Sequence, residues 1–270
     1  MTTLATTLAA VALGFALTAP VAAQPHHFGY SGDTAPSKWA SLNPEWRACA
    51  EGRNQSPVDL GGFVEAQLPA LELKYSTVGV NIVNNGHAVQ VNYAKGSQMQ
   101  PDGHPHAPYA NMVPYAPGSV FNHDGKTFEL KQFHFHSPSE HTLNGKSFPM
   151  EMHLVHADKD GNLAVVSVLM SEAPADNLIL SKLWAQMPAK AGDKNSLQAK
   201  VNVMDLLPKS KDYYRYSGSL TTPPCSEGVR WYVMKQPTSV SKAQIDAFRK
   251  AVGTANNRPP QPINARTVLK

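Results

Sequence analysis

The segment QFHFH, residues 132–136, alternates polar and aromatic side chains in the pattern of a β-strand. Side chains at positions i and i+2 share one face of a strand, whereas in a helix they point to different sides. The phenylalanines between the polar residues also favour a strand. His134 and His136 are therefore expected side by side on one face, with Gln132 next to them.

The segment EMHLV repeats this arrangement further along the chain. In a strand, Glu151, His153 and Val155 share one face. If the two strands pair, the imidazoles of His134, His136 and His153 converge on one point. The spacing thus constrains both the local structure and the chemistry of this part of the chain.

Three neutral nitrogen ligands with an open fourth position are typical of a catalytic Zn²⁺ site. Each ligating imidazole also needs a partner for its second ring nitrogen, and Gln132 and Glu151 are the local candidates. Which ring each of them orients stays open at this point. Two histidines in a strand are more often structural, but three histidines with two polar neighbours in register indicate a metal site.

The rest of the chain favours one strand-rich domain. Its 270 residues contain no internal repeat and no low-complexity linker, and 42% hydrophobic with 16% charged residues is typical of a globular protein. Helical patterns cover 177–187, 197–206 and 242–252, the last with Ser241 as its N-cap. Strands are predicted at 70–75, 78–84, 87–93, 119–122, 127–136, 149–157, 163–170 and 229–235. The expected fold is α+β, mainly β, with a largely antiparallel sheet and short peripheral helices.

The N-terminus resembles a signal peptide. Residues 1–23 carry no charged side chain, residues 8–17 are apolar, and the small residues of VAAQ fit cleavage before Gln24. The basic residue that usually precedes the apolar run is missing. A transmembrane anchor is the alternative, but Thr18 and Pro20 interrupt the run and leave it short for a span. The chain is therefore expected to be exported, to the periplasm or beyond, as a mature domain of residues 24–270.

The cysteine count and the charge limit the partners of the chain. Cys49 and Cys225 are the only cysteines, and an even count in an exported chain suggests a disulfide. The disulfide would close a loop of 176 residues (225 − 49) and contribute roughly 4–5 kcal/mol; two free buried thiols are the alternative.

The net charge is +4 with scattered lysines and arginines, so nothing supports a nucleic-acid partner. No second apolar span appears, and the oligomeric state stays open, a homodimer included.

Several motifs now point to one family. The segment SEHTLNGKSFPMEMHLV, residues 139–155, resembles the signature of the α-class carbonic anhydrases. Further blocks match in the same order: GYSG (29–32), NQSPVDL (54–60), NNGHAVQV (84–91), QFHFH (132–136), GSLTTPPC (218–225), VRWYV (229–233) and RPPQPINAR (258–266). The resemblance covers residues 26–270, and the short HFHSPSEH connection is similar to the bacterial, exported branch.

This resemblance implies a fold, a metal and a reaction. The family has a single domain around a large twisted, mostly antiparallel sheet, with zinc at the bottom of a cone-shaped cleft. Its zinc ligands correspond to His134, His136 and His153. The implied activity is the reversible hydration of CO₂ to bicarbonate and a proton, by attack of zinc-bound hydroxide. Zinc lowers the pKa of its bound water, an effect for which carbonic anhydrase is itself the standard example.

The resemblance also assigns supporting catalytic residues. Thr221 corresponds to a threonine whose hydroxyl accepts a hydrogen bond from the hydroxide and donates one to a carboxylate, here Glu140. Without the resemblance, SLTTPP would be read as a turn. His87 corresponds to the proton shuttle, because an imidazole titrates in the right range. Three further residues would order the bridging waters: Tyr30, Asn85 and Gln90.

Carbon dioxide is small and apolar, so its site needs a hydrophobic wall. The residues that correspond to this wall are Val155, Val165, Leu220, Val229 and Trp231, with Thr222 as a neighbouring cleft residue. Core packing is their alternative role. A disulfide between Cys49 and Cys225 occurs in exported members of the family, and it would brace the loop that presents Thr221.

The other histidines are expected to have no part in the metal site, and two competing functions lack support in the sequence. His141 and His156 are interpreted as buried structural residues, and five others as loop residues without a catalytic role: His26, His27, His104, His106 and His123. A non-catalytic binding domain of the same fold would lack one of the three histidine ligands, and this chain keeps them all. A zinc hydrolase of another type would usually carry a helical HExxH motif, which is not present.

Overall fold

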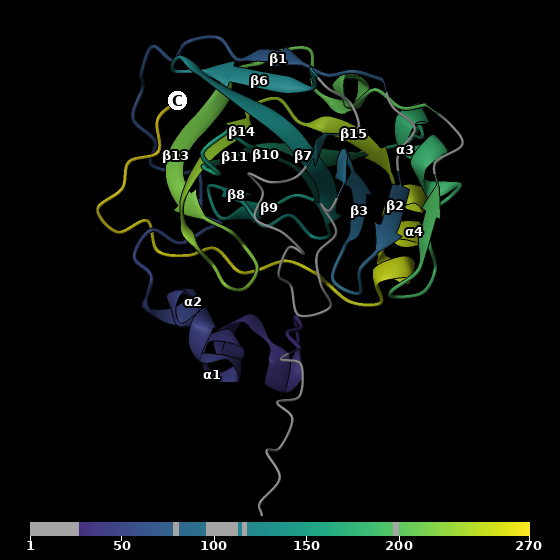
Figure 1. The fold of residues 1–270 in the computed structure, drawn as a ribbon, viewed down its shortest axis with the longest axis horizontal. Coiled ribbons are helices and arrows are strands. Elements are labelled where there is room, and N and C mark those ends of the chain that lie inside the picture. The colour runs from purple at the N-terminus through teal and green to yellow at the C-terminus, as the bar shows by residue number, and fades with distance from the viewer. Residues whose placement is uncertain (1–26, 78–80, 96–112, 115–117, 197–199) are drawn as a thin grey trace, which may run out of the picture.

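A large mixed β-sheet forms the centre of the molecule in the computed structural model, which describes residues 27–77, 81–95, 113–114, 118–196 and 200–270 (Figure 1). Within these ranges the sheet has eleven strands. Its main path runs β12 (Lys194–Ser196), β2 (Asn81–Asn84), β3 (Val89–Asn92), β7 (Lys126–His136), β10 (Met150–Ala157), β11 (Leu163–Ala173), β14 (Glu227–Met234) and β13 (Tyr213–Ser219). Beside this path lie β1 (Glu72–Lys74), β6 (Val120–His123) and β15 (Thr238–Ser241).

Most neighbouring strands of the sheet are antiparallel, as the sequence predicts. The exceptions are β14 and β15, which both pair with β11 in parallel. Two small hairpin-like pairs lie outside the sheet, β4 (Ala94–Lys95) with β5 (Val113–Pro114) and β8 (Thr142–Leu143) with β9 (Lys146–Ser147). Each of the eight predicted strands overlaps a strand of the large sheet, although residues 78–80 lie outside the described ranges.

Short helices lie at the periphery of the sheet. The N-terminal part folds into α1 (Trp39–Leu42) and α2 (Ala48–Glu51) with the 3₁₀ turns η1 (Gly32–Thr34), η2 (Pro36–Lys38) and η3 (Pro44–Trp46). Figure 1 shows α1 and α2 together beyond one end of the sheet, and α3 (Leu178–Trp184) and α4 (Lys242–Val252) beside β2. The helix α4 has the predicted bounds because Ser241 and Gln244 form a capping box.

Two predicted features of the fold are wrong. The helix expected over 197–206 is absent from residues 200–202, and only the 3₁₀ turn η5 (Val203–Leu206) forms in that region. The loop assignment of His123 also fails, because this residue ends β6 and is 5% exposed, with its ring stacked on Phe121. The turn begins one residue later, at Asp124 and Gly125, which both have positive φ. The expectations for the signal peptide and for three histidines lie outside the described residues: His26, His104 and His106.

The alternation along β7 sends aromatic rings and imidazoles to opposite faces of the sheet. Phe133 and Phe135 are fully buried in the larger apolar cluster, on one face. A smaller cluster that contains Val155, Val165 and Trp231 lies on the other face, which the histidines of β7 share. The sheet therefore has a packed apolar side and a side that combines an apolar wall with ionisable groups.

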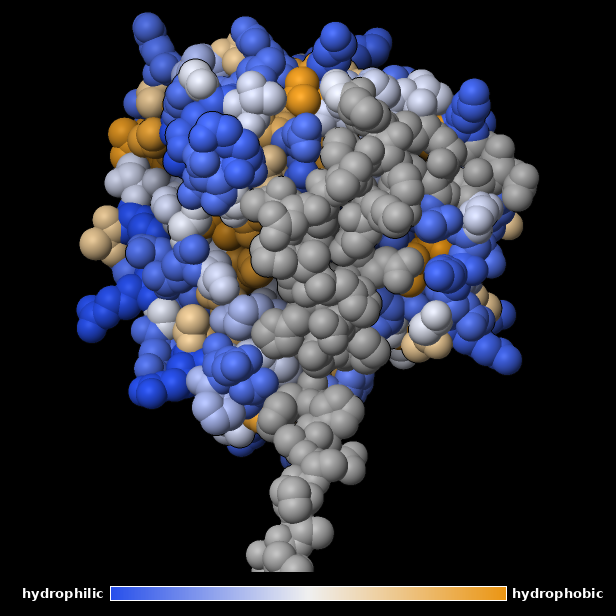
Figure 2. Space-filling view, in the orientation of Figure 1, coloured by the Kyte–Doolittle hydropathy of each residue, from blue (hydrophilic) through white to orange (hydrophobic). Residues whose placement is uncertain are grey.

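The length and polarity of the described helices and the visible surface bear on contact with a membrane. No helix among the described residues is long and apolar enough to cross a bilayer. Among the coloured residues in Figure 2, hydrophilic ones predominate, and the visible apolar residues form small, separate groups.

His156 is one of the buried, hydrogen-bonded histidines that the sequence predicts. Its side chain is 0% exposed, with Nε2 2.9 Å from the Tyr75 hydroxyl and Nδ1 3.3 Å from the Ala164 carbonyl oxygen. Burial lowers the pKa of His156 from 6.5 to about 3. The folded protein therefore keeps this ring neutral at pH values where the unfolded chain already binds a proton.

Because its folded-state pKa is depressed, the contribution of His156 to stability is lost as the pH falls below 6.5. Between pH 7 and pH 4 this loss amounts to about 3 kcal/mol. We expect the variant His156→Gln to show a flatter dependence of its unfolding free energy on pH over this range than the wild type. Denaturant unfolding at a series of pH values measures it, and parallel curves for the two proteins would contradict the assignment.

Candidate metal centre

The register between β7 and β10 brings the three histidines of the sequence motifs together. His153 lies directly opposite His134, and Glu151 lies opposite His136. One ring nitrogen from each of the three histidines falls within 4.8 Å of the others. The predicted convergence of these imidazoles is therefore present in the fold.

Each of the three rings has its second nitrogen occupied by a protein acceptor. Nδ1 of His134 is 2.8 Å from the amide oxygen of Gln132, and Nε2 of His153 is 2.7 Å from the carboxylate of Glu151. Nδ1 of His136 donates to the backbone carbonyl of Asn256 at 2.7 Å. These acceptors fix the tautomers, because the nitrogen that donates carries the proton and the other keeps its lone pair.

The atoms left facing the common point are Nε2 of His134, Nε2 of His136 and Nδ1 of His153. Nε2 of His136 is buried and has no hydrogen-bond partner among the described residues. Burial is also the largest effect on all three side chains, and it lowers each pKa below the ordinary histidine value. Three neutral nitrogens with free lone pairs are the donor set that zinc takes in catalytic sites, so the residues fit this metal.

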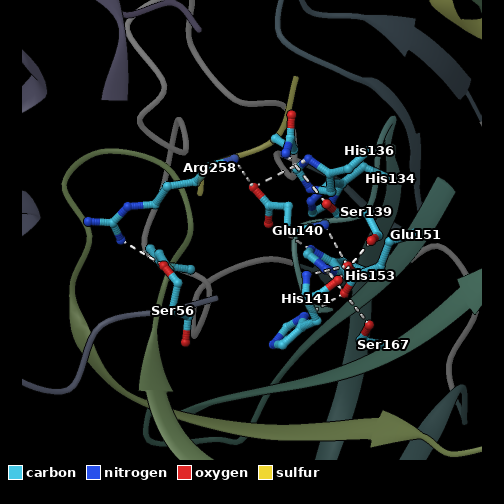
Figure 3. Close-up of polar contacts among 12 residues, drawn as sticks. Ser56, His134, His136, Ser139, Glu140, His141, Glu151, His153, Ser167 and Arg258 are labelled. Carbon is cyan, nitrogen blue, oxygen red and sulfur yellow. Dashed lines mark hydrogen bonds and ion pairs between the residues drawn. The ribbon is translucent and has the colours of Figure 1, made fainter. Parts of the chain in front are cut away.

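The carboxylate of Glu151 accepts hydrogen bonds from several neighbouring groups (Figure 3). Its Oε1 lies 2.6 Å from Nδ1 of His141 and 2.5 Å from the Ser167 hydroxyl, besides its bond to His153. Its Oε2 accepts the backbone N–H groups of Glu140 and His141, both at 2.8 Å. Burial alone would raise the pKa of Glu151, but the neighbouring histidines lower it well below its usual range. The carboxylate is therefore ionised and orients His153.

His141 belongs to this support and not to the convergent group. Its ring is 0% exposed, and its Nε2 is hydrogen-bonded to the Tyr216 hydroxyl at 2.7 Å. The Tyr216 hydroxyl in turn bonds the Ser56 hydroxyl at 2.9 Å. Both ring nitrogens of His141 thus bond to protein groups. This agrees with its interpretation from the sequence as a buried structural residue.

Glu140 is a second buried carboxylate beside the imidazoles. Its Oε1 accepts the backbone N–H of Arg258 at 2.8 Å, and its Oε2 lies 3.8 Å from Nδ1 of His153. Burial raises the pKa of Glu140 to about 7, whereas His153 and the nearby Thr221 hydroxyl act to lower it. Oε2 has no partner in normal hydrogen-bond geometry among the described residues. This oxygen therefore keeps its lone pairs available for a further hydrogen bond.

A single cleft collects most of the residues singled out in the sequence. It has a volume of about 630 Å³ with its open mouth included, and it also takes in Phe28 and Ala88. The predicted residues that line it are Tyr30, Asn85, His87, Gln90, Gln132, His134, His136, His153, Val155, Val165, Leu220, Thr221, Thr222 and Trp231. Val229 is buried in the apolar cluster behind the cleft and does not line it.

Three neighbouring strands build an apolar wall beside the histidines. Val155 of β10 pairs with Val165 of β11, and Val165 pairs with Trp231 of β14. The three side chains therefore stand in one row across the sheet. The centroids of the Trp231 and His153 rings are 4.9 Å apart. The indole N–H donates to the Ser219 carbonyl at 3.0 Å, which anchors the start of the loop that carries Thr221.

Comparison with known proteins agrees with this geometry. Residues 34–270 match the profile of the eukaryotic-type carbonic anhydrase family. The chain belongs to the α-carbonic anhydrase family. A carbonic anhydrase of Neisseria gonorrhoeae is 43% identical over 244 residues, which cover 90% of this chain and 88% of that protein.

Solved structures of carbonic anhydrases also share the fold. The α-carbonic anhydrase from Thermovibrio ammonificans, in complex with the inhibitor sulfanilamide, has a TM-score of 0.80 and 45% identity, covering 91% of this chain and 99% of that chain. A hyperthermostable carbonic anhydrase from an active hydrothermal vent chimney has a TM-score of 0.79 and 50% identity, covering 90% and 99%. These relationships identify the enzyme as a carbonic anhydrase, a lyase, and support CO₂ hydration as its activity.

Sequence reasoning missed several residues that support the site in this carbonic anhydrase. Asn256 orients His136 from outside the sheet, and its amide also donates to the His87 carbonyl at 2.9 Å. Arg258, which is 1% exposed, donates to the Ser56 carbonyl at 2.8 Å. A polar Ser167 inside the apolar run VVSVLM was a usable signal, because a buried hydroxyl needs a partner.

The carbonic anhydrase contains the disulfide between Cys49 and Cys225. The bridge joins α2 to the loop that carries Thr221, and it is packed with Phe28, Trp39 and Trp46. Nη2 of Arg258 donates to the Cys49 carbonyl at 2.8 Å. The described part of the chain holds no free cysteine.

Loss of this disulfide should destabilise the enzyme by about 2–5 kcal/mol, the usual effect of a native bridge. We expect a reductant to lower the melting temperature of the wild type. The double variant Cys49→Ser/Cys225→Ser is the matched control, because it should melt at the lower temperature with or without reductant. A wild-type melting curve that does not respond to reductant would contradict this role.

Proposed function

We propose that this carbonic anhydrase hydrates CO₂ reversibly to bicarbonate and a proton, with Zn²⁺ held by His134, His136 and His153. The observation that carries the proposal is the set of three imidazoles, one half-buried and two buried, whose free nitrogens converge while their second nitrogens are engaged. Zinc in such a site supplies a water of lowered pKa, which serves as a nucleophile near neutral pH. Gln132, Glu151 and the Asn256 carbonyl hold the three rings in the orientation and tautomer that the metal needs.

Thr221 and Glu140 orient the nucleophile in this proposal. The Thr221 hydroxyl donates its proton to Oε2 of Glu140, and its oxygen is then left to accept a hydrogen bond from the attacking group. An ionised Glu140 accepts this bond more strongly than a protonated one, and its Oε1 is already held by the backbone N–H of Arg258. Fixing the direction of the attacking lone pair removes an orientational cost from the reaction.

Carbon dioxide is proposed to lie against the apolar wall of Val155, Val165 and Trp231, with Leu220 and Thr222 beside it. These side chains line the cleft next to His153 and present no charge, which suits a small apolar substrate. Val229 supports the wall from behind.

His87 is proposed to move the reaction's proton between the site and solvent. It lies in the turn between β2 and β3, where Asn85 accepts hydrogen bonds from the backbone N–H groups of His87 and Ala88. Tyr30, Asn85 and Gln90 line the same cleft as His87 and the proposed metal ligands, so they can order the waters that carry the proton.

We also propose that residues 1–23 form a signal peptide and that residues 24–270 form the exported enzyme, periplasmic or secreted. The apolar, uncharged N-terminus supports export, and so does the disulfide, because such bridges persist in oxidising compartments.

Stopped-flow CO₂ hydration before and after removal of zinc with a chelator tests the proposal. We expect hydration that disappears on removal and returns when zinc is added. A zinc-loaded protein that does not hydrate CO₂ would instead favour a binding domain of this fold.

The variant His153→Ala should lose both zinc retention and hydration, because one of three donors is removed. His156→Gln is the matched control, since His156 lies on the same strand and is hydrogen-bonded away from the convergent group. Metal content by mass spectrometry together with stopped-flow rates measures both. A fully active, zinc-loaded His153→Ala protein would show that this residue is not a ligand.

The variant His87→Ala should lower kcat in dilute buffer by an order of magnitude or more, the scale of general acid–base contributions. The ratio kcat/KM should stay unchanged, because proton removal follows the attack on CO₂. Added imidazole should restore kcat by accepting the proton directly. A kcat that is independent of buffer in this variant would remove His87 from the proposed path.

A further inference from the structure

We infer that His27 is a second proton carrier, which passes the proton between His87 and solvent. This inference rests on the proposed function, in which His87 takes the proton from the site. The observation behind it is the position of the His27 ring, whose centroid lies 5.0 Å from the centroid of the His87 ring at an interplanar angle of 36°. The sequence alone gave His27 no catalytic role.

His87 is held in a packed position at the edge of the cleft. Its ring is stacked on Phe28 with a centroid separation of 3.9 Å and an interplanar angle of 13°, and the residue is only 5% exposed. Its backbone is fixed from both sides, because its N–H donates to Asn85 and its carbonyl accepts from Asn256. Phe28 is itself 0% exposed and packs on Trp39, so the ring under His87 is rigidly supported.

A proton carrier must also release its proton to buffer, and a ring as buried as His87 has little contact with solvent. His27 is exposed and adjoins His87. At this centroid separation, the ring nitrogens of two imidazoles can meet directly or through one water. His27 therefore extends the path from a buried group to an exposed one.

The transfer needs no chemistry beyond the movement of one proton. Protonated His87 gives a ring N–H proton to a neutral nitrogen of His27, which then releases a proton to a buffer base. The neighbouring Tyr30 cannot take this part, although its ring lies 6.5 Å from His87. Burial raises the pKa of the Tyr30 hydroxyl well above its usual value, and the hydroxyl has no hydrogen-bond partner among the described residues.

The alternative is that His27 only packs against His87, and two variants separate the roles. His27→Phe keeps an aromatic ring at this position and removes the proton-carrying nitrogens, while His27→Ala removes both. If His27 carries the proton, both variants should show a severalfold lower kcat in dilute, non-imidazole buffer. In both, kcat/KM should be unchanged and imidazole should restore kcat. Melting temperatures of the zinc-loaded variants report whether folding is affected.

A mutant cycle with His87→Ala completes the experiment. In the His87→Ala background, removal of His27 should cause no further loss of kcat, because the path is already broken upstream. Full kcat of His27→Phe in dilute buffer, with His87→Ala slow, would overturn the role of His27 and leave the proposed function intact. If His87→Ala is itself insensitive to buffer, both the shuttle and the inference fail.

Discussion

The antiparallel pairing of β7 with β10 is the constraint on which the site depends. Its register sets His153 opposite His134 and Glu151 opposite His136. A shift of one residue in either strand would turn that strand's imidazoles to the other face, where Phe133 and Phe135 now fill the apolar core, and would break up the convergent set. The burial of those phenylalanines therefore fixes the register, and the register fixes the geometry of the candidate metal centre. Function and core packing are specified by the same alternation.

Two buried carboxylates next to this pairing would be costly without compensation, since both Glu140 and Glu151 are 0% exposed. Backbone N–H groups and imidazoles satisfy Glu151, and its ionised state follows from them. Glu140 is less well satisfied, and burial raises its pKa to about 7. This difference divides their roles in the proposed mechanism, because Glu151 holds a ring in place while Glu140 keeps one oxygen for Thr221. A buried ionisable group without a full set of hydrogen-bond and charge partners is typical of a functional site, whereas a purely structural group is usually fully partnered.

Much of this organisation could be predicted from the sequence, and the failures have physical causes. The period of two identified both strands of the site, and the capping residues gave the bounds of α4. The strand β13 was missed because YYRYSGS ends in small residues that read as a turn. Gly218 is required there by close approach, since a Cβ would lie 2.1 Å from the Ser56 hydroxyl. Asn256 and Arg258 escaped prediction because their contacts join segments more than a hundred residues apart.

The small N-terminal cluster ties the disulfide to the proposed proton path. Phe28, Trp39, Trp46 and the two cysteines pack as one group, so the ring under His87 and the bridge beside the Thr221 loop share the same neighbours. The buried Arg258 strengthens this connection, because its guanidinium lies over Trp39 and bonds the Cys49 carbonyl while its backbone N–H holds Glu140. Loss of the disulfide would therefore disturb two parts of the site together: the pair Thr221 and Glu140, and the Phe28 ring on which His87 stacks. The segment outside the sheet acts as a brace for both halves of the proposed reaction, attack on carbon and removal of the proton.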